Sequence, residues 1–204
     1  MPLKVRSLTV LIAVLLFSSC RDEEQQVTPD TTVTIEGRRY PVAVIGTQNW
    51  TTTNYDGPGG AGYDVVNSKP QYGKYYSNAE LPAIVLPAGW RIPTQEDYKK
   101  LAEFHGVTLP SHGTDTEKIK SIISETNWNN VSGTNASGFN AYPAGYIFGG
   151  APPIDGDIAE FWTSEGVTVS IQEAGANLTS LRMVFYESGD SPDYKFNVRF
   201  MRGD

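Results

Sequence analysis

Aromatic and acidic side chains recur in the second half of the chain, and together they could bind a ligand. The segment "PPIDGDIAE" carries Asp155, Asp157 and Glu160. Aromatic residues lie near Gly- and Asp-rich stretches at Tyr146, Phe148, Tyr186 and Tyr194. Aromatic faces with neighbouring carboxylates suit sugars and peptides. We therefore expect a ligand-binding surface on irregular loops, formed by Tyr146, Asp155, Asp157 and Tyr194.

Metal-ligating residue types are also present. His105, His112, Asp115 and Glu117 have side chains that bind zinc. His105, however, falls near the C-terminus of an expected helix, where an imidazole is favoured without a metal, and His112 falls in a loop. The carboxylates of "PPIDGDIAE" are oxygen ligands of the kind that calcium prefers, so calcium stays open as an alternative. We assign no metal and no cofactor.

Cysteine and serine chemistry is poorly represented. Cys20 is the single cysteine of the 204 residues, which excludes a domain stapled by disulfides and a cysteine-based metal or redox site. A Ser-His-Asp triad needs a positioned serine, and no nucleophile-elbow sequence is present. The residue types therefore predict that the protein is not an enzyme.

The first 19 residues resemble a bacterial lipoprotein signal peptide. Lys4 and Arg6 form a basic start, "LTVLIAVLLF" is an apolar run too short to span a bilayer, and "SSC" leads to Cys20. An ordinary secretory signal is the alternative. The lipoprotein interpretation makes Cys20 the lipidated residue and the mature N-terminus, and several acyl groups at one end hold a chain stably on a membrane.

Residues 20–31 are expected to form a flexible acidic tether, because they are polar and lack periodicity. Their acidic run, Asp22 to Glu24, is similar to signals that send some lipoproteins to the outer face of the outer membrane. The chain has 16 basic and 23 acidic residues, and cleavage of the signal would remove two basic ones and no acid. This charge argues against nucleic acid as a partner. Residues 32–204 suit one domain.

Two helices are expected in that domain. Pro93 discourages helix before it and Thr94 can act as an N-cap, so the first helix should begin at Gln95 and stop at Gly106. Its buried face should include Tyr98, Leu101, Ala102 and His105. A second helix is expected at about 115–125, with a capping box at Thr114 and Glu117 and an apolar face of Ile119, Ile122 and Ile123.

Short runs of branched and aromatic residues, separated by Gly, Pro and Asp, predict strands through the rest of the domain. "TVTIEGRRYPVAVIG" should form two strands around Glu36 and Gly37, and the last third is rich in such runs. Trp162 is expected in the core. Trp90 and Arg91 could form a binding platform, but a buried Trp90 with Arg91 lying over it is the favoured interpretation. Two helices among many short strands predict an α+β domain.

Five segments in order resemble the Fibrobacter succinogenes major paralogous domain: "YGKYYSNAE", "GWRIPTQEDYKKL", "SGFNAYPAGYIFGG", "AEFWTSE" and "FNVRFMR". The resemblance implies a C-type-lectin-like fold with mostly antiparallel strands, in a secreted or lipid-anchored surface protein. Within it, Phe139, Pro143, Gly145 and Trp162 match positions that determine core and turns. The sugar-binding tripeptides of calcium-dependent lectins are missing.

The "GWRIPT" turn is also similar to a stretch of formylglycine-generating enzymes, which share the lectin-like architecture. Those enzymes use a pair of cysteines to hold copper, and this chain has no cysteine within the domain. The sequence therefore predicts a lipid-anchored envelope protein of the outer membrane and cell surface that binds an extracytoplasmic glycan or protein. A structural or assembly subunit is the alternative, and an enzyme comes after it.

Overall fold

The computed structural model describes residues 31–63, 69–187 and 191–203. The predicted signal peptide, Cys20 and the tether up to residue 30 lie outside these residues. The strands are β1 (Thr32–Ile35), β2 (Arg38–Ile45), β3 (Gln48–Thr51), β4 (Ala61–Gly62), β5 (Lys74–Tyr75), β6 (Ser111–His112), β7 (Ile147–Phe148), β8 (Ile158–Trp162), β9 (Thr168–Ala174), β10 (Ser180–Tyr186), β11 (Tyr194–Lys195) and β12 (Met201–Arg202). The helices are α1 (Gln95–Phe104), α2 (Thr116–Ile119) and the 3-10 turns η1 (Pro70–Tyr72) and η2 (Asn78–Ala83).

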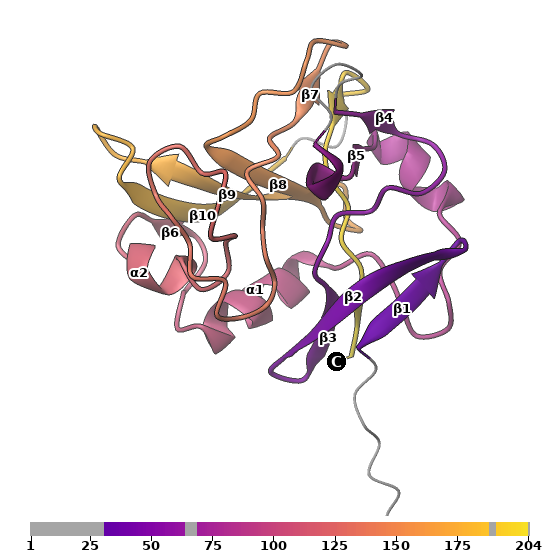
Figure 1. Cartoon of the computed structure of the whole chain (residues 1–204), viewed down its shortest axis with the longest axis horizontal. Helices are drawn as coiled ribbons and strands as arrows, with labels where there is room; N and C mark the ends of the chain where they lie inside the picture. Colours follow the sequence, from indigo (N-terminus) through magenta and orange to yellow (C-terminus); the bar gives the residue numbers. More distant parts are fainter. Residues whose placement is uncertain (1–30, 64–68, 188–190, 204) are drawn as a thin grey trace, which may run out of the picture.

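The named strands pair antiparallel in two larger and two smaller sheets. The larger sheets have the orders β1-β2-β3-β12 and β6-β10-β9-β8, and β11-β7 and β4-β5 form the smaller ones. Figure 1 shows the two larger sheets on different sides of α1. Mostly antiparallel strands with few helices confirm the predicted α+β class.

The first sheet brings the two ends of the domain together. β1 and β2 form the predicted hairpin, and its two turn residues, Glu36 and Gly37, have φ values of 46° and 80°. Two consecutive positive φ angles are typical of a tight hairpin turn whose twist matches that of the strands. β12 then pairs with β3, with Met201 opposite Trp50, so the C-terminal end lies beside the N-terminal hairpin (Figure 1).

Helix α1 begins and ends as the sequence predicts. Thr94 Oγ1 accepts a 3.1 Å hydrogen bond from the Asp97 backbone N–H, and Asp97 Oδ2 accepts a 2.6 Å bond from the Thr94 N–H. This reciprocal capping satisfies donors that the first helical turn leaves free. Gly106, with φ 74°, follows the last turn in the left-handed region. Tyr98, Leu101 and Ala102 are buried, as their spacing predicts, whereas His105 is half-buried at the C-cap.

The predicted second helix at about 115–125 is confirmed over its first turn, and its predicted length is wrong. Helix α2 spans only Thr116–Ile119, its N-cap is Asp115, and the Asp115 side chain makes no capping bond. The predicted capping box of Thr114 and Glu117 is also wrong. The Glu117 carboxylate lies 2.6 Å from Lys120 Nζ, so it pairs forward along the chain.

The backbone after α2 bonds to a distant segment. Ile123 forms a parallel β-bridge with Ala141, the Ala141 N–H donates to Ile122 O at 3.0 Å, and the Ser124 N–H donates to Ala141 O at 3.0 Å. These bonds replace the bonds to the fourth preceding residue that a helix requires. Ile119, Ile122 and Ile123 are nevertheless fully buried. Their burial therefore comes from a tertiary pairing and not from one helix face.

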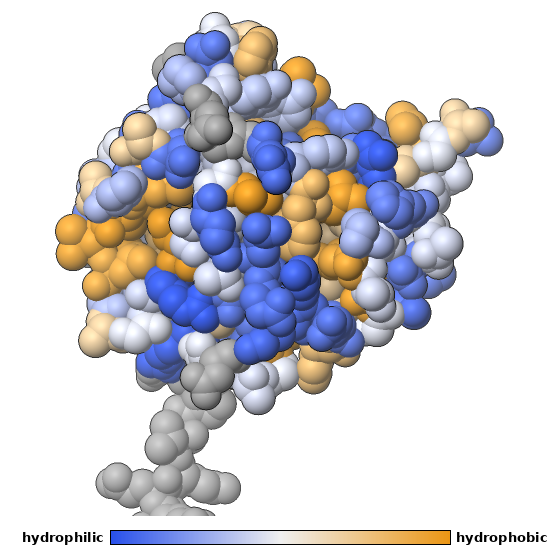
Figure 2. Space-filling model, turned by 180° about the vertical axis from the view of Figure 1, so that it is seen from behind, coloured by the Kyte–Doolittle hydropathy of each residue, from blue (hydrophilic) through white to orange (hydrophobic). Residues whose placement is uncertain are grey.

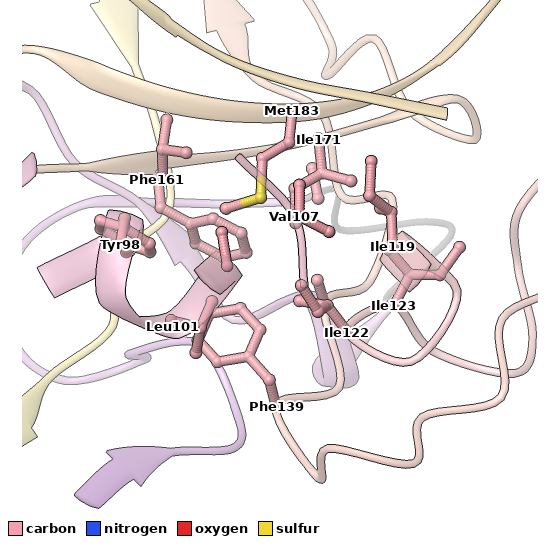
Figure 3. Packing of buried hydrophobic residues seen from close by; sticks show 14 of the residues in the cluster. Tyr98, Leu101, Val107, Ile119, Ile122, Ile123, Phe139, Phe161, Ile171 and Met183 are labelled. Atoms are coloured by element: carbon pink, nitrogen blue, oxygen red, sulfur yellow. The ribbon is translucent and has the colours of Figure 1, made fainter. Parts of the chain in front are cut away.

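The main core lies between α1, the segment after α2 and one face of the second sheet. Figure 3 shows side chains from all three converging: Tyr98, Leu101, Val107, Ile119, Ile122, Ile123, Phe139, Phe161, Ile171 and Met183. A second cluster surrounds Trp162, which is fully buried as predicted and donates a 2.6 Å bond from Nε1 to Tyr76 O. The two clusters fix the second sheet on the rest of the domain.

Trp90 belongs to the second cluster. It is 7% exposed, so it packs in the interior and offers no open binding platform. The guanidinium over its ring belongs to Arg202, at 5.5 Å from the ring centre, whereas Arg91 forms an ion pair with Asp97 of α1. The prediction that Trp90 is buried is confirmed, and the guanidinium of Arg91, which was predicted to lie over Trp90, pairs with Asp97.

A buried arginine joins the first sheet to the core. Arg199 is fully buried and donates hydrogen bonds to Asn54 Oδ1, Thr51 O, Phe139 O and Asn140 O over distances of 2.6 to 3.0 Å. Burial lowers the pKa of its guanidinium to about 9. Four acceptors surround the guanidinium, and no carboxylate bonds it in the described part of the chain. Its role is therefore to hold the segment at residues 51–54 against the segment at residues 139–140.

The surface combines a mostly hydrophilic rear face with an apolar patch at one side (Figure 2). One exposed apolar stretch begins at the end of η2 and covers residues 82–88, where Val85 is 69% exposed. In the described part of the chain, none of the helices has the length and apolar character needed to cross a membrane.

Candidate functional site

Strands β8, β9 and β10 present two different faces. Ala159 and Phe161 of β8 are buried in the main core, and the residue between them, Glu160, belongs to the opposite face because side chains alternate along a strand. The strand register places Glu160 opposite Ser170 of β9 and Ser170 opposite Val184 of β10. The second face therefore carries polar groups at the centre of the sheet.

A concavity of about 1160 Å³ lies on this second face. Segments from four parts of the domain line it, and we refer to it below as the concavity. Its lining residues are Asn78, Tyr146, Ile158, Glu160, Glu165, Gly166, Val167, Gln172, Tyr186, Glu187, Ser191, Pro192, Tyr194 and Phe196. This volume is slightly larger than small-molecule sites usually occupy, so the space also suits a segment of a larger ligand.

One wall of the concavity is aromatic. The ring centres of Tyr146 and Tyr194 lie 5.9 Å apart, and Tyr194 stacks on Phe196 at 5.5 Å with an angle of 9° between the rings. Phe148, the partner of Tyr194 in the β7–β11 pair, contacts the Tyr194 ring at 4.7 Å. Rings held by other rings offer a rigid apolar surface to a ligand.

An ordered polar chain supports the floor of the concavity, and two of its members, Gln172 and Tyr186, line the concavity. Gln172 Nε2 donates to Ser170 Oγ and to Tyr186 Oη, each at 3.1 Å, and Arg182 donates a 2.7 Å bond to Gln172 Oε1. Because its oxygen and its nitrogen both have partners, the Gln172 amide has a fixed orientation. The tyrosine hydroxyl at the edge of this chain keeps its own proton for a ligand.

The carboxylate of Glu160 lies at the inner side of this polar face. The residue is 4% exposed, and Thr168 donates a 2.7 Å hydrogen bond from Oγ1 to Glu160 Oε1. Burial raises the pKa of this carboxyl to about 7, against the lowering effect of the Thr168 bond. The buried position disfavours the charged form, so the group exchanges its proton near neutral pH.

Glu165 and Glu187 add two further carboxylates to the lining. Glu165 accepts from the Gln95 backbone N–H at 3.1 Å, which places a negative charge at the N-terminus of α1. This contact fixes the turn between β8 and β9 against the helix.

A comparison with known protein families identifies the family of the chain. The sequence pattern of the Fibrobacter succinogenes major domain matches residues 43–202, more than half of the chain. The chain belongs to this family. The five segments that resemble the family all lie within the match. No curated protein and no solved structure matches the chain.

The Fibrobacter succinogenes major domain contains the entire concavity, because the lining runs from Asn78 to Phe196. The family description names no ligand and no reaction. The match therefore establishes which family the chain belongs to, and the use of the site has to be argued from its geometry.

The structure brings together two of the four predicted ligand-binding residues. Tyr146 and Tyr194 contact each other and line the concavity, but Asp155 and Asp157 are not part of the lining. Asp155 forms an ion pair with Lys69 and accepts a 2.8 Å bond from Tyr63 Oη. Asp157 is half-buried, and desolvation followed by repulsion from Glu173 raises its pKa.

The candidate metal ligands occupy separate positions in the fold. His105 caps α1 and contacts the ring of Phe104 at 5.3 Å, and His112 is exposed in β6. Asp115 lies 2.9 Å from Lys118 Nζ, which stabilises its charge and lowers its pKa. Among the residues that the structure describes, no three His, Cys, Asp or Glu side chains form a group that could hold a metal.

Sequence reasoning missed part of the lining within the Fibrobacter succinogenes major domain. Gln172, Glu165, Glu187 and Phe196 were not predicted as site residues, and Glu160 was considered only as a calcium ligand. The sequence does contain a pattern that could have identified Gln172. In "VTVSIQE" the polar residues Ser170 and Gln172 alternate with the apolar Val169 and Ile171, which indicates a strand with one polar face.

Proposed function

We propose that this protein is a lipid-anchored component of the outer membrane at the cell surface, and that its domain binds an extracytoplasmic glycan or protein through the concavity. One observation carries the binding proposal. The concavity joins a wall of stacked aromatic rings to a floor of oriented hydrogen-bonding groups and carboxylates. Such a combination gives a ligand both apolar contact and orientation. The C-type-lectin-like fold is part of the same proposal.

The anchoring part of the proposal rests on the N-terminal sequence. Cys20 directly follows a basic start and an apolar run, and polar acidic residues separate it from β1. Eleven residues, 20–30, precede the described domain, and an extended chain reaches at most about 3.5 Å per residue. The domain would therefore lie within roughly 40 Å of the membrane surface.

Two observations make an assembly subunit the weaker candidate. Assembly through strand addition needs a long unpaired edge. The edge strands of the first sheet, β1 and β12, have four and two residues, and those of the second sheet, β6 and β8, have two and five. An enzymatic role is also disfavoured, because Cys20 is the one cysteine of the chain and precedes the domain. We therefore propose a binding protein without catalytic activity.

The test is a screen of immobilised extracytoplasmic glycans and surface proteins with the chain from residue 20 onward, carrying Cys20→Ser. Tyr186→Ala removes a 39% exposed ring from the concavity, and Phe104→Ala removes a 62% exposed ring from α1, outside the lining. The proposal expects a ligand whose binding is lost in the first variant and retained in the second. Equal binding by both variants to every ligand found would contradict it.

A further inference from the structure

The charged side chains that line the concavity are all acidic among the described residues. Three of its lining residues are glutamates, at positions 160, 165 and 187, and none of the described lining residues is Lys, Arg or His. Carboxylates that share one hollow surface repel one another and attract a cation from solution. The lining therefore favours a positively charged ligand over a neutral or anionic one of the same shape.

Glu160 gives this charge a defined position. It is 4% exposed, Thr168 bonds its Oε1, and no described residue donates a hydrogen bond to its Oε2. A buried carboxylate is costly to charge unless a donor or cation satisfies it. The oxygen that the fold leaves without a donor is thus a fitting partner for an N–H group of the ligand.

The aromatic wall suits the same kind of ligand. Tyr146 is close enough to Glu160 that this carboxylate, after desolvation, raises the pKa of the Tyr146 phenol. The ring of Tyr194 lies against Tyr146 and is held by Phe196. A cation near a carboxylate and over the face of a tyrosine gains from both, since the ring face is electronegative.

The nearest cation on this sheet face does not occupy the acidic end. Arg182 donates to Gln172 Oε1, and the register places that pair in the row of Ile158, one row away from Glu160. The positive group of this sheet face therefore lies at the Gln172 end, and the buried carboxylate of Glu160 lies nearer the aromatic wall. A bound cation would be directed to Glu160.

We propose that the concavity binds lysine side chains of an extracytoplasmic polypeptide, with the lysine ammonium at Glu160 and its stem along Tyr146. The inference rests on the proposed binding function and names its ligand. Glu160 is 4% exposed, so its carboxylate is reached by an ammonium on a slender stem. Lysine carries its charge on four carbons, whereas an amino sugar carries it directly on a ring. The volume accommodates a segment of chain around that side chain.

The experiment measures binding of a fluorescent oligolysine to the chain from residue 20 onward, carrying Cys20→Ser, at about 0.15 M salt to screen long-range attraction. The second probe is the same peptide with every side-chain amine acetylated. A third is a glucosamine oligosaccharide, which is a cationic amino sugar. Glu160→Gln is compared with Glu103→Gln, an exposed glutamate of α1 that removes the same charge outside the concavity.

We expect oligolysine to bind, acetylation to weaken binding by roughly tenfold or more, and Glu160→Gln to do the same while Glu103→Gln has little effect. Melting curves establish that both variants are folded. Equal binding of the acetylated peptide, equal weakening by the two variants, or binding of the glucosamine oligosaccharide alone would overturn the inference. A neutral ligand that depends on Tyr186 would overturn it too, yet would leave the proposed binding function standing.

Discussion

Glu160 occupies a position in which its charge is unfavourable for folding. It lies on a strand whose neighbouring residues are fully buried, and its carboxylate is 4% exposed with one hydrogen bond to Oε1. Burial raises its pKa from 4.5 to about 7. A residue that folding alone would select here is a neutral one, so the presence of a carboxylate is consistent with a use in binding.

This position makes stability depend on pH. Between 4.5 and about 7 the folded chain retains a proton that the unfolded chain has released, so the free energy of unfolding falls as pH rises through this range. Glu160→Gln has no such proton. The free energy of unfolding of Glu160→Gln, relative to that of wild type, should therefore rise by on the order of 3 kcal/mol from about pH 4 to about pH 8.

Urea unfolding of both proteins across that range measures the difference directly. The control is Glu103→Gln, which removes an exposed glutamate outside the concavity. A difference between Glu160→Gln and wild type that changes with pH no more than that of the control would show that the Glu160 carboxyl titrates in the folded protein as it does in the unfolded chain.

Single residues differ in how far their roles could be predicted. Tyr146 and Tyr194 were predicted site residues, and both line the concavity. Their contact with a ligand stays a prediction. Asp155 was predicted with them, yet it pairs with Lys69 and Tyr63, which lie 86 and 92 positions away in the chain. No local pattern reveals such a partner, so the sequence could not distinguish this aspartate from a free one.

The elements show the same division between local and distant causes. Helix α1 was predicted at its first residue, because its cap, its buried face and its stop all lie within 94–106. The segment after α2 has a helical pattern of isoleucines, but the bridge between Ile123 and Ala141 draws the backbone away. The polar face of β9 was readable from its alternation, whereas its pairing with β8 and β10, which creates the site, was not.

The cap of α1 provides a test at this scale. Thr94→Ala removes the oxygen that accepts from the Asp97 N–H and leaves the carboxylate that bonds the Thr94 N–H. The expected loss is about 1 kcal/mol in the free energy of unfolding. Chemical denaturation measures it, with Thr108→Ala, an exposed threonine outside the helix, as the control. A loss no larger than that of the control would mean that Asp97 caps the helix without Thr94.

At the scale of the whole molecule, the predicted anchor separates the domain from the membrane by a short tether. Cells fed labelled palmitate should label the wild type, and the protein should fractionate with the membranes, because several acyl chains hold it there. Cys20→Ser should be unlabelled and soluble. Equal labelling of the two proteins would rule out Cys20 as the lipidated residue.

The family of the whole chain was readable from five short segments in order, and the match over residues 43–202 confirms it. The concavity could not be predicted from the sequence in the same way. Its lining comes from segments between Asn78 and Phe196 that meet only because the second sheet packs between two core clusters. Membership of the family thus follows from local motifs, while the site follows from tertiary packing.

The central claim is that the domain binds its ligand in the concavity. The most direct measurement is NMR chemical-shift mapping of the chain from residue 20 onward, carrying Cys20→Ser, with the strongest ligand from the screen of glycans and surface proteins. The account predicts that the largest shifts fall on the concavity lining, at Tyr146, Glu160, Gln172, Tyr186 and Tyr194. Shifts concentrated on the apolar stretch at residues 82–88 or around Asp155, with the lining unchanged, would contradict it.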